Sequence, residues 1–105
     1  MRSDHSRAPE RFAADTESFL AYLGLERGLS ANTLAAYRRD LVGYTGWLAE
    51  QGLRLRTVDR GALDRFVNAR RSSGSAPSSV ARQLAAIRML HRFLAEEGVR
   101  ADDPA

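Results

Sequence analysis

Apolar residues recur every three or four positions along most of the chain, which is the period of an amphipathic α-helix. The pattern predicts four helices, at about residues 9–24, 30–51, 60–73 and 77–97. No segment alternates apolar and polar residues with the period of two that is typical of a strand. We therefore expect an all-α fold, a compact bundle of four helices. The stripes predict a core of Phe12, Phe19, Leu20, Leu34, Tyr37, Leu41, Tyr44, Leu48, Leu63, Phe66, Val80, Leu84, Ile87, Leu90 and Leu94, with Trp47 at its edge.

Start and stop signals bound these four stretches. Ser30 and Asp59 stand where a side chain can cap the first amides of a helix, and Pro9 and Pro77 suit a first helical position. Ala76, directly before Pro77, has no side chain that could cap. Each stretch is followed by a glycine that we expect to end it: Gly24, Gly52, Gly74 and Gly98.

Length and composition narrow the class of protein. The 105 residues are enough for one domain, and residues 1–8, ahead of the first stripe, are expected to be a flexible tail. The chain has no cysteine, which excludes disulfides and thiolate metal sites. No apolar run approaches the roughly 18 residues of a membrane span, and the N-terminus lacks a secretory signal. We expect no membrane partner and a cytoplasmic location.

The charge is distributed unevenly. All 16 basic residues are arginine, and the net charge is +3. Residues 54–92 carry 9 arginines against 2 aspartates, whereas the segments on either side are neutral or acidic. A basic middle suggests a polyanion as partner. Arginines that merely keep a surface soluble would give the same pattern.

Enzyme chemistry is poorly supported. His91 lies within the apolar stripe of the last helix, where a histidine is typically a core residue. No His or carboxylate cluster has the spacing of a metal site, no glycine-rich loop could hold a phosphate, and no serine has a His–Asp pair nearby. We expect no cofactor and no metal.

DNA binding is better supported. Helix N-termini, hydroxyls, amides and guanidinium groups are the usual phosphate contacts, and arginine can also read guanine. Such groups lie on the polar faces of the second and fourth predicted helices, where the second also carries small residues at Ala35, Ala36, Gly43 and Gly46. The candidate DNA-binding residues are Asn32, Thr33, Arg38, Arg39, Ser78, Ser79, Arg82, Arg88 and Arg92.

Three segments resemble the Xer-type tyrosine recombinases of the phage-integrase family. They are FLAYL at 19–23 with ERGLSANTLAAYRRDL at 26–41, SSVARQLAAIR at 78–88, and the ending DDPA at 102–105. The motifs are short, but their order and spacing cover nearly the whole chain. The resemblance implies a SAM-like core-binding domain at residues 9–98, which grips one side of duplex DNA with its second and fourth helices. Residues 99–105 would begin the linker to a catalytic domain.

The resemblance also implies what these residues do not do. In the family, the catalytic domain supplies the tyrosine nucleophile and its phosphate-binding residues. Tyr22, Tyr37 and Tyr44 lie in the wrong part of the family pattern, so we expect no catalytic residue here. The longer protein is expected to be a site-specific recombinase that assembles with other recombinase subunits on DNA, in integration or in chromosome dimer resolution. The alternative is a helical protein–protein interaction module with the same fold.

Overall fold

The architecture is that of a computed structural model, which describes the backbone of residues 2–99 and 102–104 and the side chains of residues 14–99 and 102–104. It contains the helices α1 (Arg2–Glu26), α2 (Ala31–Glu50), α3 (Arg60–Ser72) and α4 (Pro77–Glu96). The described residues include no strand. The all-α, four-helix prediction is confirmed, and three of the helices match their predicted bounds to within a residue at each end.

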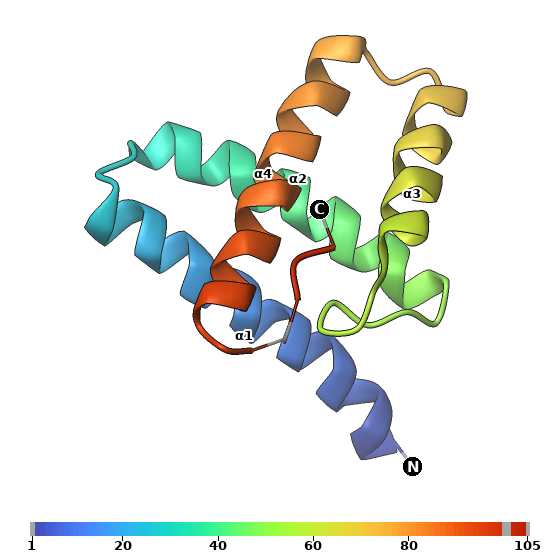
Figure 1. The fold of residues 1–105 in the computed structure, drawn as a ribbon, viewed down its shortest axis with the longest axis horizontal. Coiled ribbons are helices and arrows are strands. Elements are labelled where there is room, and N and C mark those ends of the chain that lie inside the picture. Colours follow the sequence, from blue (N-terminus) through green and yellow to red (C-terminus); the bar gives the residue numbers. More distant parts are fainter. Residues whose placement is uncertain (1, 100–101, 105) are drawn as a thin grey trace.

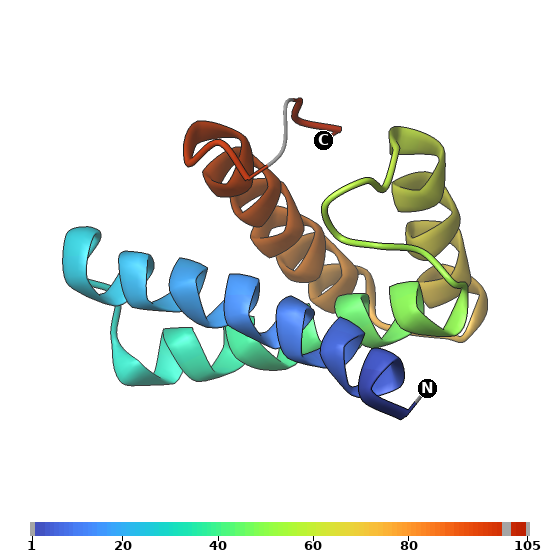
Figure 2. The same ribbon diagram turned by 90° about the horizontal axis from the view of Figure 1, so that it is seen from below.

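The helices are arranged around two antiparallel neighbours. α1 and α2 lie side by side and are joined by the short connection at 27–30 (Figure 1). α4 crosses both, and α3 packs against α4 (Figure 1). Viewed from below, α1 and α2 form one layer, and α3, α4 and the C-terminal segment lie on one side of it (Figure 2).

The predicted caps are present. The hydroxyl of Ser30 accepts from the amide of Thr33 at 3.2 Å, and the carboxylate of Asp59 accepts from the amide of Ala62 at 2.9 Å. Ala76 makes no side-chain cap, and Pro77 begins α4 directly. The glycines that follow α2, α3 and α4 all have positive φ, as a helix-ending glycine requires.

α1 departs from its prediction at both ends. It begins at Arg2 rather than near Pro9. The prediction missed this first part because the polar residues ahead of Pro9 show no apolar stripe. It also continues past Gly24, and the chain turns instead at Gly28, where φ is 65°. Gly24 allows α1 and α2 to approach closely, since a Cβ there would lie 3.2 Å from Cδ1 of Leu34. The flexibility of residues 1–8 stays a prediction.

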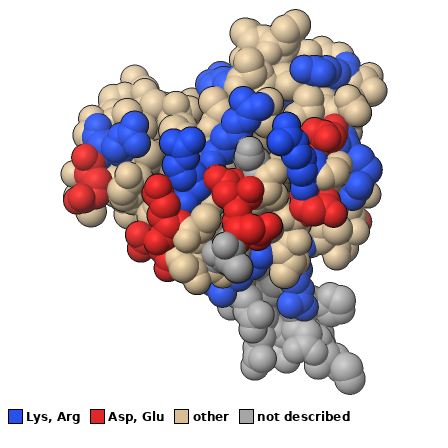
Figure 3. Space-filling model, in the orientation of Figure 1, with Lys and Arg blue, Asp and Glu red and all other residues tan. Residues whose placement is uncertain are grey.

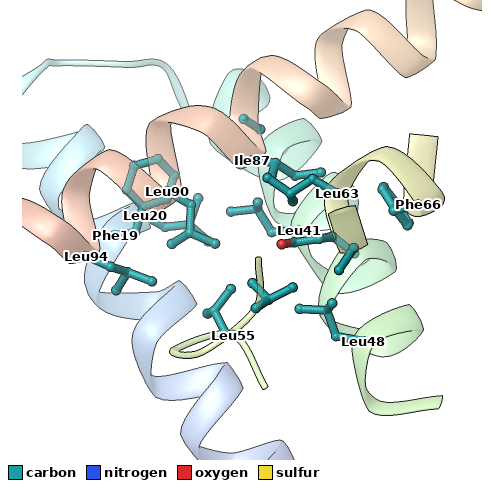
Figure 4. Close-up of a cluster of buried hydrophobic side chains, with 14 of the residues drawn as sticks. Phe19, Leu20, Leu41, Leu48, Leu55, Leu63, Phe66, Ile87, Leu90 and Leu94 are labelled. Carbon is teal, nitrogen blue, oxygen red and sulfur yellow. The ribbon is translucent and has the colours of Figure 1, made fainter. Parts of the chain in front are cut away.

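One hydrophobic cluster joins all four helices (Figure 4). Most of the predicted core residues are buried in it. Leu34, Tyr37 and Leu84 are only half-buried, as is Trp47 at the predicted edge. The side chain of Phe12 lies outside the described residues. Leu23, Leu55, Val58, Ala62 and Ala86 complete the buried set.

The connection between α2 and α3 is part of the core, which its sequence did not predict. Leu55 is fully buried and Val58 nearly so. Arg56 holds the same connection on α1 through two hydrogen bonds of 3.0 Å to the carboxylate of Asp15, which is itself buried. A segment too short to show a period cannot reveal its inward side by pattern, and contacts from other elements decide it.

A polar pair is built into the apolar interior. His91 is fully buried, as predicted, and its Nε2 lies 2.8 Å from the hydroxyl of Tyr44, which comes from α2. The Tyr44 ring also packs edge-on against Phe66 of α3, with ring centroids 5.2 Å apart. The pair therefore links α2, α3 and α4 without leaving the tyrosine hydroxyl unsatisfied.

We expect Leu55→Ala to lower the free energy of unfolding by about 2–5 kcal/mol, because it leaves a cavity in the core. Leu25 offers the matched control, since it is 84% exposed and Leu25→Ala should change stability by less than about 0.5 kcal/mol. Urea unfolding followed by circular dichroism measures both. Equal effects would contradict the assignment of the 51–59 connection to the core.

Candidate nucleic-acid interface

The predicted residues on α2 divide into those that the fold uses and those that it leaves exposed. Thr33 takes part in the cap, where its hydroxyl accepts from that of Ser30 at 3.0 Å. Arg38 forms an ion pair with Glu17 of α1. Asn32 and Arg39 are exposed. None of the ion pairs among the described residues includes Arg39. Of the two neighbouring arginines, Arg39 is therefore the more available to a ligand.

On α4, Arg82 is tied to α2. Its Nε and Nη2 donate to the two carboxylate oxygens of Asp40 at 2.8 and 2.9 Å. Asp40 is buried, whereas about half of the Arg82 side chain remains exposed. The sequence pattern predicts that Arg82 lies on the outward face of α4, but it does not predict the contact with Asp40. The contact combines two planar groups through parallel hydrogen bonds, which is the strongest geometry for such a pair.

The ion pair keeps Arg82 charged. Its hydrogen bonds to Asp40, and next the negative charge of that carboxylate, raise the pKa of the Arg82 guanidinium. A cation whose pKa is raised by a carboxylate stabilises the fold while both groups are charged, and on the alkaline side this stabilisation is lost as the pH rises through the raised pKa. For arginine this loss falls at strongly alkaline pH, so the charge of Arg82 does not change around neutral pH.

Gln83, next to Arg82, is a site residue that the sequence reasoning missed. It is buried, and its amide Nε2 donates to the main-chain oxygen of Asp40 at 2.8 Å. Its Oε1 accepts from Nε of Arg70, on α3, at 2.9 Å. A signal for it existed, because Gln83 lies three residues after Val80 and four before Ile87, within the apolar stripe.

A hollow lies where α2, α3 and α4 meet, and we call it the α2–α4 groove. Arg39, Arg70 and Gln83 line it at one end, and Glu50 lies about three turns farther along α2. Its other lining residues are Asp40, Val42, Gly43, Gly46, Trp47 and Phe66. Among the predicted site residues, Arg39 lines this groove, and Arg82 adjoins it through Asp40.

The remaining candidates on α4 lie elsewhere along its exposed side. Ser78 is exposed and Ser79 half-buried at the start of the helix. Arg88 lines a second hollow, between α3 and α4, into which the C-terminal segment places the buried Pro104. Arg92 lines a third, between α1 and α4. The exposed residues of α4 are Pro77, Ser78, Ala81, Arg82, Ala85, Arg88, Arg92 and Glu96, and we call those from Ser78 to Arg92 the exposed strip of α4.

At least one face of the domain carries positive and negative charges side by side. On the face that carries the C-terminal segment, arginines alternate with clusters of aspartate and glutamate (Figure 3). The described side chains include no group of three His, Asp or Glu that could hold a metal ion. Among the described residues, no helix has the length and apolar character needed to cross a membrane.

Comparisons with known proteins identify the domain. The family model for the phage integrase N-terminal SAM-like domain matches residues 16–98. The chain belongs to this family. The match covers α2, α3, α4 and the C-terminal part of α1, so the predicted resemblance and SAM-like fold are confirmed.

Curated relatives within the SAM-like family include tyrosine recombinases. The chain is 47% identical over 93 residues to tyrosine recombinase XerC of Erythrobacter litoralis, which covers 89% of this chain. It is 42% identical over 88 residues to tyrosine recombinase XerD of Brucella abortus, which covers 84%. The chain spans only 28% of the length of either relative.

Replacement of Arg82 by alanine should lower the melting temperature by several degrees, because the buried carboxylate of Asp40 would lose both of its side-chain donors. Arg39→Ala removes the same charge from the same region and should leave the melting temperature nearly unchanged. Adding Asp40→Asn to Arg82→Ala should recover part of the loss, because no buried charge then remains. Equal melting temperatures for the two single variants would show that the Asp40–Arg82 pair contributes nothing.

Proposed function

We propose that this SAM-like domain binds duplex DNA through the exposed strips of α2 and α4, as the N-terminal DNA-binding module of a site-specific tyrosine recombinase. The exposed strip of α2 consists of Asn32, Ala35, Arg39, Gly43 and Gly46. The observation that carries the proposal is that the two strips meet. Arg39 directly precedes Asp40 on α2, and Arg82 of α4 is bound to Asp40. Arginines of both helices thus lie around one crossing point, where a single stretch of phosphate backbone could reach them.

The composition of the strips suits close approach to DNA. The major groove, about 12 Å wide, admits an α-helix. Small residues on the side that faces the DNA let a helix lie closer to the base edges, and longer polar side chains beside them can reach the bases. Along α2 the exposed side carries Ala35, Gly43 and Gly46, and along α4 it carries Ala81 and Ala85. A Cβ added at Gly46 would meet nothing within 4 Å, so the chain itself does not require glycine there.

The relatives' names indicate the reaction that the domain serves. They are tyrosine recombinases of the XerC and XerD types, and the match covers 28% of the length of each. We propose that the longer protein recombines DNA, with chromosome dimer resolution as its role, and that it assembles with other recombinase subunits on DNA. Such a protein acts in the cytoplasm, where the bacterial chromosome lies.

Binding to DNA should be strongly dependent on salt. If about four phosphates are neutralised, the logarithm of the binding constant should fall with the logarithm of salt concentration at a slope near −3.6. Arg39→Ala should make the slope shallower by about 0.9 if Arg39 meets a phosphate. If Arg39 instead reads a base, preference at one position should relax while the slope stays. Fluorescence anisotropy with a labelled mixed-sequence duplex at several NaCl concentrations measures the slope.

An affinity that does not depend on salt, or that Arg39→Ala and Arg82→Ala together leave unchanged, would reject DNA binding through these strips. The fold would then serve as a helical protein–protein interaction module. Because Arg82→Ala also affects stability, the comparison should be made well below the melting temperature of each variant.

The 105 residues should not form a covalent adduct with DNA. Tyr44 is fully buried with its hydroxyl near His91, and Tyr22 and Tyr37 are half-buried. Tyr22 lines the hollow between α1 and α4 with Arg27 and Arg92, but no histidine lines that hollow. The chain should leave a nicked duplex unmodified on a denaturing gel. An adduct that disappears on replacement of one of these tyrosines by phenylalanine would overturn this expectation.

A further inference from the structure

The amide of Gln83 is a buried bridge between three helices. Its side chain comes from α4, its Nε2 donates to the main-chain oxygen of Asp40 on α2, and its Oε1 accepts from Nε of Arg70 on α3. The orientation of the amide is unambiguous, because a main-chain oxygen can only accept and an arginine Nε–H can only donate. Gln83 is 4% exposed, so water does not compete freely for these bonds.

Gly43 leaves room for this amide. A Cβ at position 43 would lie 3.1 Å from Nε2 of Gln83, which is closer than most such contacts. Glycine inside a helix costs about 1 kcal/mol relative to alanine. This close approach is a structural reason for a glycine at position 43 of α2. A larger residue there would crowd the Gln83 amide.

The bridge determines where the Arg70 guanidinium points. Because Nε–H is turned toward Gln83, the edge of the guanidinium that carries Nε and Nη2 faces that amide, and the far end, where Nη1 and Nη2 form a second fork, is turned away from it. Both Arg70 and Arg39 line the α2–α4 groove. The described carboxylates include none in an ion pair with Arg70. Arg82, by contrast, already gives Nε and Nη2 to Asp40.

We infer that Arg70 of α3 binds a DNA phosphate at the end of the α2–α4 groove beside Arg39, and that Gln83 is the positioning residue that aims it there. The inference rests on the proposed function. It extends the DNA-binding surface beyond α2 and α4 to the C-terminal turn of α3. A guanidinium that is held in place loses less freedom on binding than a free one, and its fork matches two phosphate oxygens.

Arg71 provides a matched control for Arg70. It is the next residue on the same turn, carries the same charge, and lines the hollow between α3 and α4 instead of the α2–α4 groove. Arg70→Ala should weaken binding to a labelled mixed-sequence duplex about ten-fold or more and make the salt slope shallower by about 0.9. Arg71→Ala should weaken DNA binding by less than about three-fold. Arg71 lies outside the α2–α4 groove, so its charge would act on a phosphate there only through screening solvent.

A double-mutant cycle tests the role of Gln83. Gln83→Met keeps the volume of the side chain and removes both hydrogen bonds. It should weaken DNA binding when Arg70 is present and have little further effect in the Arg70→Ala background. A merely structural role would weaken binding equally in both backgrounds. Circular dichroism checks that each variant folds.

Arg70→Lys keeps the proposal testable if Gln83→Met does not fold. Lysine retains the charge and lacks the fork, so the salt slope should stay while the affinity falls. If Arg39→Ala weakens binding but Arg70→Ala and Arg71→Ala behave alike, this inference is wrong and the proposed function stands. If the unaltered chain shows no salt-dependent binding, both are wrong.

Discussion

The crossing of α2 and α4 at Asp40 is the contact on which the rest of the molecule depends. Asp40 accepts two hydrogen bonds from Arg82 through its carboxylate and one from Gln83 through its main-chain oxygen. Gln83 then reaches α3 through Arg70. One turn farther along α2, Tyr44 meets His91 of α4 and Phe66 of α3. The interface is thus polar on its outer side and aromatic on its inner side.

Polar groups buried at a crossing must be paired, since an unpaired buried donor or acceptor costs about 1–3 kcal/mol. Here the pairings are directional. The two oxygens of Asp40 face a guanidinium fork, and the Gln83 amide faces a donor on one side and an acceptor on the other. Apolar contacts alone would allow α4 to slide or rotate on α2, whereas these bonds are satisfied in one register only.

The arginines consequently have two kinds of role. Arg38, Arg56 and Arg82 pair with carboxylates of Glu17, Asp15 and Asp40, all of which come from the acidic first half of the chain. Two arginines of the basic 54–92 segment, Arg56 and Arg82, are therefore neutralised by carboxylates that come from the first half of the chain. Arg39, Arg88 and Arg92 are exposed and take no part in the described ion pairs. The second group offers a DNA-binding surface its whole charge, and Arg82, which keeps about half of its side chain exposed, adjoins that surface while serving the fold.

Local patterns are enough to predict α2, α3 and α4 to within a residue at each end, the caps at Ser30 and Asp59, and most of the core. Those features depend on local rules: an apolar stripe with a period near 3.6, a capping side chain, and a glycine that can take positive φ. The apolar stripe also predicts that His91 lies in the core, where the structure buries it, and the family resemblance rests on short motifs spread from α1 to the C-terminal segment.

Tertiary structure alone decided which polar residues are used by the fold and which remain for a ligand. Asp40 and Arg82 are 42 positions apart, and Arg70 meets Gln83 across a turn between two helices. Nothing local distinguishes Arg82 from Arg92, or Arg70 from Arg71, because each pair has the same chemistry and a similar neighbourhood in sequence. Likewise, Leu55 is buried because the 51–59 connection packs into the hydrophobic cluster that the four helices share. Such assignments follow from the crossing of helices, which a one-dimensional pattern does not contain.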